Sequence, residues 1–186
     1  MNQRYSTYKD VAAEADKLLL SSGAPRLANG IAVDVERIAR VHCHFDVAEV
    51  PDLNLGGPVL GAFIPEFDLI MLKENCLYPR RRFSLAHELG HAQLEHKFGS
   101  NSTPFGQANA MYFRCEDGDI EIEKNGRRSR PRAEILADRF AAHLLMPEAL
   151  VREVWRKAFD ERDAAEMLMV SLQAMRIRLS QLRLQT

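Results

Sequence analysis

Two histidines and a glutamate in the segment Phe-Ser-Leu-Ala-His-Glu-Leu-Gly-His, residues 83–91, have the H-E-x-x-H spacing of zinc hydrolases. Because an α-helix has about 3.6 residues per turn, His87 and His91 would lie on one helix face, where both rings can reach a single metal ion. Glu88 would project beside that ion and could take a proton from a water molecule. The residues between them are apolar or small, which predicts a buried helix. Two buried imidazoles need polar partners, either a divalent cation or ordinary hydrogen bonds within a core.

A catalytic zinc usually has three protein ligands and one open position, so a third ligand must be found. An extended H-E-x-x-H-x-x-G-x-x-H pattern would supply a third histidine, but Leu94 stands at its glycine position and Lys97 at its histidine position. His96 lies five residues after His91, about 140° round the helix, so its ring would point away from the metal. The remaining source is a glutamate from a separate helix, as in His2Glu zinc sites.

Glu134 is the natural candidate for that glutamate. It lies on a largely apolar helix predicted over 133–146, where an unpaired carboxylate would be costly. Asp138 would lie one turn later on the same face, where it could accept a hydrogen bond from the outer ring nitrogen of a ligating histidine. In the alternative interpretation, Glu134 is a first-turn acid favoured by the helix dipole and Asp138 is a surface acid. Spacing alone leaves both interpretations open.

The elements expected around these residues are amphipathic helices and short strands. His42 and His44 would share one face of an early strand and could form a second metal pair, although a surface pair is the simpler interpretation. We expect an α+β, zincin-like fold in one domain, 1–186, with a short mixed or antiparallel sheet packed on the two metal-bearing helices. The catalytic core would cover about residues 30–147, and 148–186 would form a helical C-terminal subregion. Helices are predicted over 6–20, 35–41, 79–96, 133–146, 148–159 and 163–184, the last broken at Ser171, and strands over 42–47, 59–64, 69–72, 111–115 and 120–123.

The composition excludes several classes of protein. With 186 residues, 46% hydrophobic and 27% charged, the chain is typical of a soluble globular protein with a substantial core. Its 26 acidic and 25 basic residues leave a net charge of -1, which gives no overall footprint for nucleic acid or anionic lipid. The N-terminus has no apolar signal core, and no run approaches the roughly 18 apolar residues of a membrane span. Three cysteines without C-x-x-C spacing fit a reducing compartment. We therefore expect a cytoplasmic protein.

Three blocks of the chain, in this order, resemble the ImmA/IrrE family of zinc-dependent metallo-endopeptidases, which are cytoplasmic enzymes of bacteria and their mobile elements. The resemblance implies that His87, His91 and Glu134 bind Zn²⁺ and that Glu88 is the catalytic base. It also implies cleavage of a regulatory protein, typically a helix-turn-helix transcriptional repressor encoded nearby, which relieves repression. The matching blocks are 33–39, 81–91 and 134–147, and 170–179 has the family's closing pattern.

The resemblance leaves substrate choice open. Members often have a histidine four residues after the second ligand, where Glu95 stands here, and a glutamate before the Ala-Asn or Ala-Asp pair, where Leu136 stands. A substrate strand could pair with an exposed edge in residues 59–72. The donor that would stabilise the oxyanion is also undecided, with Tyr78, Tyr112, His143 and the arginines as candidates.

Two other functions remain alternatives at this point. Residues 164–177 have the spacing of a helix-turn-helix, which is typical of a DNA-binding regulator. However, seven basic and six acidic residues between 148 and 186 make a weak phosphate-binding surface, so we expect this segment to pack on the core and not to bind nucleic acid directly. The other alternative is an antitoxin-like or sensor protein whose metal site is structural or inactive.

Overall fold

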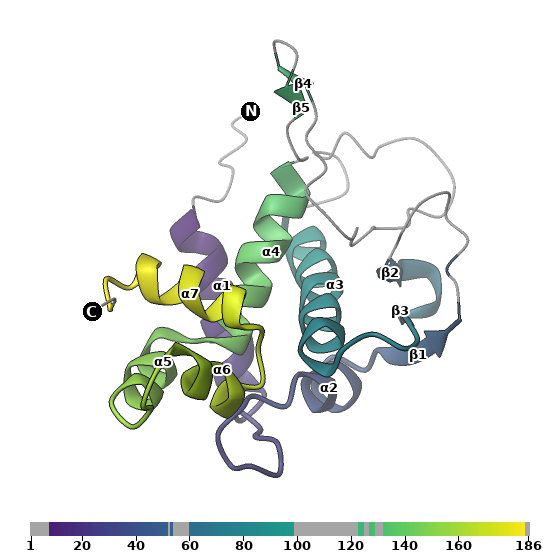
Figure 1. Ribbon diagram of the computed structural model, residues 1–186. Helices are drawn as coiled ribbons and strands as arrows, with labels where there is room; N and C mark the ends of the chain where they lie inside the picture. The colour runs from purple at the N-terminus through teal and green to yellow at the C-terminus, as the bar shows by residue number, and fades with distance from the viewer. Residues whose placement is uncertain are drawn as a thin grey trace.

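The computed structural model describes residues 8–51, 53, 60–98, 123–124, 127–128 and 132–184. Within these residues, two long helices, α3 (Tyr78–Phe98) and α4 (Arg132–Leu145), lie side by side at the centre. A small sheet lies on one side of α3, and the remaining long helices lie on the far side of α4 (Figure 1). The structure confirms the predicted α+β class and the short mixed sheet beside the two central helices.

The sheet has three strands in the order β1–β3–β2. β2 (Gly61–Ile64) and β3 (Leu69–Lys73) form the predicted antiparallel hairpin, which turns through a 3-10 segment at Pro65–Phe67. β1 (Asp46–Val50) pairs with β3 in parallel, a pairing that the sequence did not predict. Burial alternates along β3, so Ile70 and Leu72 join the main core under α3, while Leu69 and Met71 face outward.

The strand predicted over 42–47 is wrong over 42–45, because β1 begins only at Asp46. α2 (Val35–Arg37) continues into a π-helical turn at Ile38–His42, and the left-handed φ of 61° at His44 ends this helical stretch. Burial of Val35, Ile38 and Ala39 fixes the helix, so the local alternation of apolar residues did not decide the conformation. His42 instead shares a hydrogen bond of 3.0 Å with Ser21 at the end of α1 (Tyr8–Ser21). The two histidines therefore do not share a strand face.

The close crossing of α3 and α4 depends on Gly90. A Cβ atom at this position would lie 3.1 Å from the Phe140 ring and 3.3 Å from the Cα of Ala137. Both distances are tighter than ordinary packing, so a side chain at this position would require Phe140 or the α4 backbone to shift by a few tenths of an ångström. The crossing brings the first turns of α4 against the histidine-bearing turns of α3.

Gly90→Ala is expected to push the two helices apart. We expect a loss of about 1–3 kcal/mol in the free energy of unfolding, the usual cost of overpacking a core, together with weaker metal binding. Urea unfolding and a chelator competition measure the two effects. Ala92 is also buried on α3, and Ala92→Gly, which opens space, serves as a control for altered helix propensity. Unchanged metal affinity in Gly90→Ala would show that the site tolerates a wider crossing.

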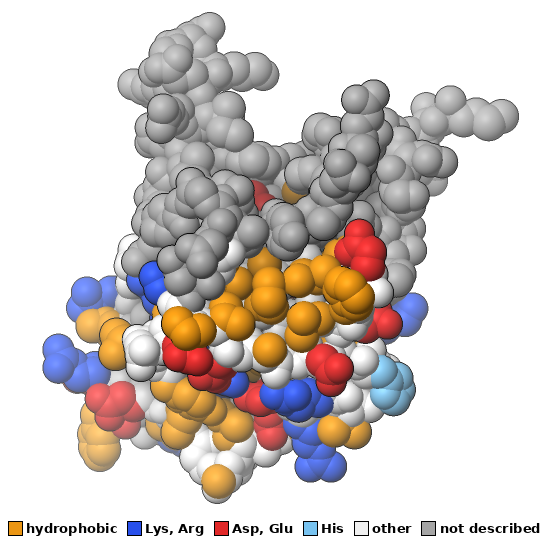
Figure 2. Space-filling model, turned by 90° about the vertical axis from the view of Figure 1, so that its right-hand side faces the viewer, with side chains coloured by type: hydrophobic (Ala, Val, Ile, Leu, Met, Phe, Trp, Pro, Cys, Tyr) orange, Lys and Arg blue, Asp and Glu red, His pale blue; other side chains and the backbone are white. Residues whose placement is uncertain are grey.

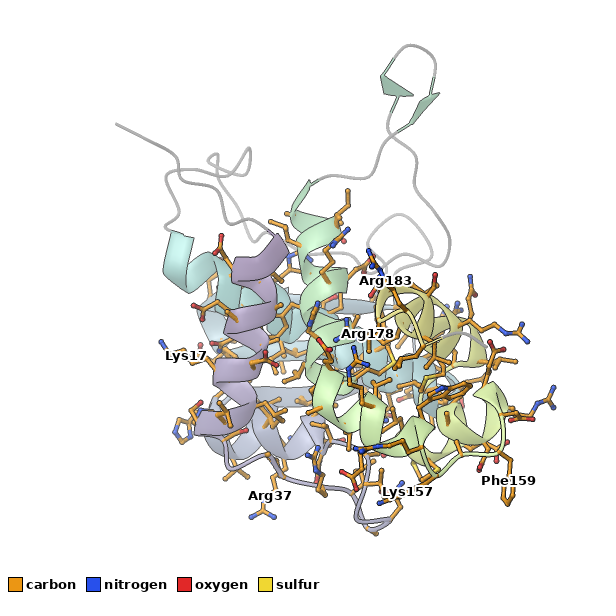
Figure 3. The ribbon with its side chains drawn as sticks, turned by 90° about the vertical axis from the view of Figure 1, so that its left-hand side faces the viewer. Lys17, Arg37, Lys157, Phe159, Arg178 and Arg183 are labelled. Atoms are coloured by element: carbon orange, nitrogen blue, oxygen red, sulfur yellow. The ribbon has the colours of Figure 1, made fainter. Side chains whose placement is uncertain are left out.

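The C-terminal part consists of α5 (Glu148–Trp155), α6 (Glu161–Leu168) and α7 (Leu172–Gln181). The helix predicted over 148–159 ends at Trp155, and the predicted break at Ser171 is confirmed, because its hydroxyl caps α7 by accepting from the Ala174 N–H. Arg178 lies between α7 and α4 (Figure 3), where its Nε donates to the Met146 carbonyl at 2.9 Å. This part of the chain is therefore packed into the main core, as expected.

The remaining predicted elements fall largely outside the described residues. The strands predicted over 111–115 and 120–123 lie outside the described residues, except for Glu123. Glu123 belongs to a two-residue strand, β4 (Glu123–Lys124), which pairs with β5 (Arg127–Arg128). Among the described residues, no helix combines the length and apolar character that a membrane crossing requires.

Candidate metal centre

His87, His91 and Glu134 meet at one point between α3 and α4. The Nε2 atoms of the two histidines lie 3.0 Å apart. The two carboxylate oxygens of Glu134 face one ring each, at 3.1 Å from Nε2 of His87 and 3.2 Å from Nε2 of His91. One candidate ligand atom from each residue therefore falls within 4.8 Å of the others, an arrangement that could hold a metal ion. The helix crossing at Gly90 brings Glu134 to the two histidines, although it follows them by 43 or more positions in the sequence.

The burial and charge of these side chains match what a divalent cation needs. His87 is fully buried and His91 is 4% exposed. Burial would raise the pKa of Glu134, but its hydrogen bonds with His87 and His91 lower it to about 2. Burial would lower the pKa of His87, but Asp138 and Glu134 raise it to about 10. A proton on His87 thus balances the buried carboxylate in the metal-free site, and a bound cation can take its place.

The donor set also fits zinc in particular. Two imidazoles and one carboxylate are the ligands of the His2Glu class of catalytic zinc sites. Burial and the neighbouring His87 ring hold the pKa of His91 below its ordinary value, so this ring is neutral and can coordinate. The residues present therefore fit the implied ion.

Asp138 orients the first of these histidines. Its Oδ1 atom lies 2.8 Å from Nδ1 of His87, so the ring donates this hydrogen bond and leaves Nε2 turned toward Glu134. Asp138 lies one turn after Glu134 on α4, the position in which the sequence placed it. This contact is the one predicted for a carboxylate that supports a ligating histidine.

Asp138→Asn is expected to weaken zinc binding by about 10- to 100-fold, because an amide holds the imidazole less firmly and makes it less basic. Competition with a chromophoric chelator measures the affinity. Asp16→Asn, which changes an exposed acid on α1, is the matched control and should bind zinc like the wild type. Equal affinities for the two variants would show that the Asp138 contact does not support the site.

Glu88 lies beside this cluster and is fully buried. Neither carboxylate oxygen forms a hydrogen bond of regular geometry with the described residues. Burial raises the pKa of Glu88 to about 8, more than the charge of His87 and the backbone of Phe63 lower it. A buried polar group without a partner is uncommon in native proteins and indicates a missing ligand, ion or water. Glu88 therefore has the surroundings of a group that acts on a bound molecule.

Gly61 makes the space that Glu88 occupies, and the sequence analysis missed it. A Cβ atom at Gly61 would lie 2.9 Å from Oε1 of Glu88 and 3.1 Å from its Cγ. The backbone of β2 therefore runs directly past the carboxylate. A glycine inside an apolar strand is a known signal of close approach and could have indicated this contact.

The other sequence candidates do not reach this cluster or lie outside the described residues. The Tyr78 ring lies 5.9 Å from the guanidinium of Arg82, and His143 contacts Arg178 at 3.3 Å. Each is nine residues from the nearest member of the cluster on its own helix, which is about 13 Å along the axis. Neither can serve as an oxyanion donor from these positions. Tyr112 and the side chain of His96 lie outside the described part of the chain.

Comparison with known proteins places this geometry in a family. A family model described as the IrrE N-terminal-like domain, Peptidase_M78, matches residues 59–180. The chain belongs to the IrrE N-terminal-like family. The matched range contains the three candidate ligands, Glu88 and Gly61, and confirms the resemblance to the ImmA/IrrE family drawn from the sequence.

Two proteins similar to this member of the IrrE N-terminal-like family are longer than this chain. The "Radiation response metalloprotease IrrE" of Deinococcus radiodurans is 30% identical over 139 residues, which cover 73% of this chain and 38% of that protein. A solved "Mycobacterium tuberculosis transcriptional regulator" has a TM-score of 0.58 and 19% identity, covering 92% of this chain and 46% of that one. The second likeness shows a shared fold. The chain thus spans less than half the length of either protein.

Proposed function

We propose that this protein is a zinc-dependent endopeptidase. The observation that carries this proposal is the convergence of His87, His91 and Glu134 next to the buried carboxylate of Glu88, which forms no hydrogen bond of regular geometry with the described residues. Membership of the IrrE N-terminal-like family and similarity to a protein named as a metalloprotease support the same reaction class. A structural metal site would not need a second acid without a partner beside the ligands.

The side chains have separate roles in this proposal. His87, His91 and Glu134 hold the ion, and Asp138 fixes the orientation of His87. When bound, zinc polarises the scissile carbonyl and makes a water molecule acidic enough to be deprotonated near neutral pH. Glu88 accepts the proton of the attacking water and passes it to the leaving amine. In the metal-free site burial raises the pKa of Glu88 to about 8. The positive charge of a bound ion would lower this pKa and leave the carboxylate ionised at neutral pH, as a base must be.

The substrate would lie extended along β2. Among the described residues, β2 pairs with no strand other than β3, so its other edge has no strand partner there. An extended peptide that adds to this edge would pass Gly61, the residue in contact with Glu88. The edge strand would therefore align the scissile bond with the base, which agrees with the docking edge expected from the sequence.

We propose a helix-turn-helix transcriptional repressor, encoded near this gene, as the substrate in the cytoplasm. Support comes from the sequence resemblance to the ImmA/IrrE family, in which cleavage of such a repressor relieves repression. A DNA-binding function for this chain has less support, although the solved structural neighbour is named a transcriptional regulator. In α7, Arg178 is buried, and the exposed guanidinium of Arg176 donates to Glu161 at 2.6 Å, which offsets its charge.

Metal analysis tests the first step of the proposal. The purified protein should contain about one zinc per chain, and His87→Ala or Glu134→Ala should lose it. Removal of zinc with a chelator should lower stability by about 3 kcal/mol when free zinc in the untreated sample is near 100 times its dissociation constant. His42→Ala, which removes an exposed imidazole bonded to Ser21, should retain full metal content. Metal retained by Glu134→Ala would contradict the site.

Co-expression with the neighbouring repressor tests the second step. Wild-type protein should convert the repressor into two fragments, and Glu134→Ala should leave it intact. An intact repressor, together with salt-sensitive binding of DNA by the purified chain, would favour the regulator function instead.

A further inference from the structure

The outer face of the sheet is apolar and separate from the main core. Register and burial place Ala48, Val50, Ile64, Leu69 and Met71 on this face, all partly exposed. Ala62 lies on the same face and is buried in a small cluster with Leu53, against which Val50 and Met71 pack. Phe67 in the hairpin turn is 74% exposed. Figure 2 shows a patch of hydrophobic side chains on this side of the molecule, with several acidic side chains at its edges. α3 covers the opposite face of the same sheet, whereas no described helix covers this one.

Three acidic residues define one end of this outer face. Asp46 is the cross-strand neighbour of Leu69, and Glu66 and Asp68 lie in the turn between β2 and β3. All three are exposed, and none forms an ion pair with another described residue. Lys73 lies at the opposite end of β3 and faces the same way. The face therefore has a negative end, an apolar centre and a single basic residue at its far end.

These dimensions fit one helix. Three strands about 4.8 Å apart span about 10 Å, the diameter of an α-helix, and the five residues of β3 rise about 17 Å, the length of about 11 helical residues. Helices are the elements that normally cover the open face of such a sheet. These exposed acids, which form no ion pair with the described residues, favour a partner with basic residues, and DNA-binding proteins carry basic residues in excess.

We propose that the outer face of the sheet binds a basic amphipathic helix of the protein substrate. Its apolar side packs on Leu69 and Met71, and its lysines or arginines lie over Asp46, Glu66 and Asp68. The identity of this helix as part of the substrate rests on the proposed proteolytic function, but the affinity for a basic amphipathic helix does not. The face would hold the substrate at a distance from the edge of β2, where hydrolysis takes place.

A synthetic peptide tests the proposal directly. The probe is a fluorescein-labelled helix of 14 residues with leucines on one side and lysines on the other, and its binding to the full chain is followed by fluorescence anisotropy. The triple variant Asp46→Asn, Glu66→Gln, Asp68→Asn should bind about tenfold more weakly at low salt, with a smaller difference at about 0.5 M salt. Asparagine at position 68 tolerates the left-handed φ of 47° found there.

A second variant and a matched control separate docking from general charge effects. Met71→Gln should weaken binding about tenfold at both salt concentrations, because it removes apolar contact area. The control triple Asp16→Asn, Glu153→Gln, Glu166→Gln removes the same charge from exposed positions on α1, α5 and α6, and it should bind like the wild type. Equal loss in both triple variants, or no loss in Met71→Gln, would overturn the proposal.

Two further outcomes are informative. If another segment of this chain already covers the face, the Met71→Gln variant will unfold at lower urea while the affinity for the peptide stays unchanged, and the proposal fails. Docking does not require catalysis, so Glu88→Gln and metal-stripped protein should bind the peptide with wild-type affinity. Peptide binding without hydrolysis of any repressor would reject the proposed function and retain the docking face.

Discussion

Glu88→Gln is expected to slow peptide hydrolysis by about 100- to 10,000-fold, the usual contribution of a general base, while the zinc content stays at the wild-type level. Glutamine has nearly the same shape as glutamate but cannot accept and return a proton at neutral pH. The ligands of the ion are unchanged in this variant, because Glu88 is not one of the three converging donors. Cleavage rates from co-expression or purified components, measured beside metal analysis, separate the two effects.

The matched control for this substitution is Glu166→Gln, which makes the same chemical change at an exposed position on α6. It should cleave a short peptide at the wild-type rate. Cleavage by Glu88→Gln within tenfold of the wild type would show that another group takes the proton. Loss of zinc together with activity would instead show that the carboxylate supports the metal centre.

In the metal-free protein, the effect of Glu88→Gln on the free energy of unfolding should depend on pH. Burial raises the pKa of Glu88 from 4.5 to about 8, so the folded protein holds this proton at pH values where the unfolded chain has lost it. This difference in pKa lowers the free energy of unfolding of the wild type. The loss is absent below the unfolded pKa of 4.5 and grows as the pH rises toward about 8. Glu88→Gln should remove that cost, so its advantage in stability over the wild type should increase between these pH values.

Local periodicity predicted one half of the site and left the other half open. The spacing of His87 and His91 fixes both rings on one face of α3, and the structure shows their Nε2 atoms 3.0 Å apart. Glu134 is on another helix, and no pattern in the sequence states how α3 and α4 cross. The crossing depends on Gly90, and the room for Glu88 depends on Gly61. Both contacts join residues far apart in the chain, so a search for local motifs missed them.

The errors in the fold have the same origin. The alternation over 42–47 is a local signal for a strand, but the buried residues of α2 and the following π-turn extend the helical conformation through His42. The hairpin of β2 and β3 was predictable, because a short turn sets its register. The parallel pairing of β1 with β3 was not, because these strands are joined by a long connection whose path is set by tertiary packing.

The second large effect is expected at Arg82, which joins the motif helix to the C-terminal part of the chain. This side chain is only 2% exposed. Its guanidinium donates to the carbonyls of Leu168 at 2.7 Å, Met169 at 2.6 Å and Val33 at 2.6 Å. Met169 has a left-handed φ of 52° at the end of α6, so its carbonyl is not part of a continuing helix. Arg82 therefore satisfies backbone acceptors from two regions that also share the apolar core with α3.

Arg82→Met is expected to lower the free energy of unfolding by about 3–5 kcal/mol, because it leaves buried carbonyls without donors while it keeps most of the apolar stem. Arg82→Lys should fall between this variant and the wild type, since one ammonium group cannot reach all three carbonyls. Urea unfolding of the zinc-loaded protein measures both. Arg37→Met, at an exposed position on α2, should change stability by less than about 0.5 kcal/mol. If Arg82→Met unfolds at the same urea concentration as Arg37→Met, these carbonyls have other donors and the C-terminal helices are held to the metal-bearing core mainly by their apolar contacts.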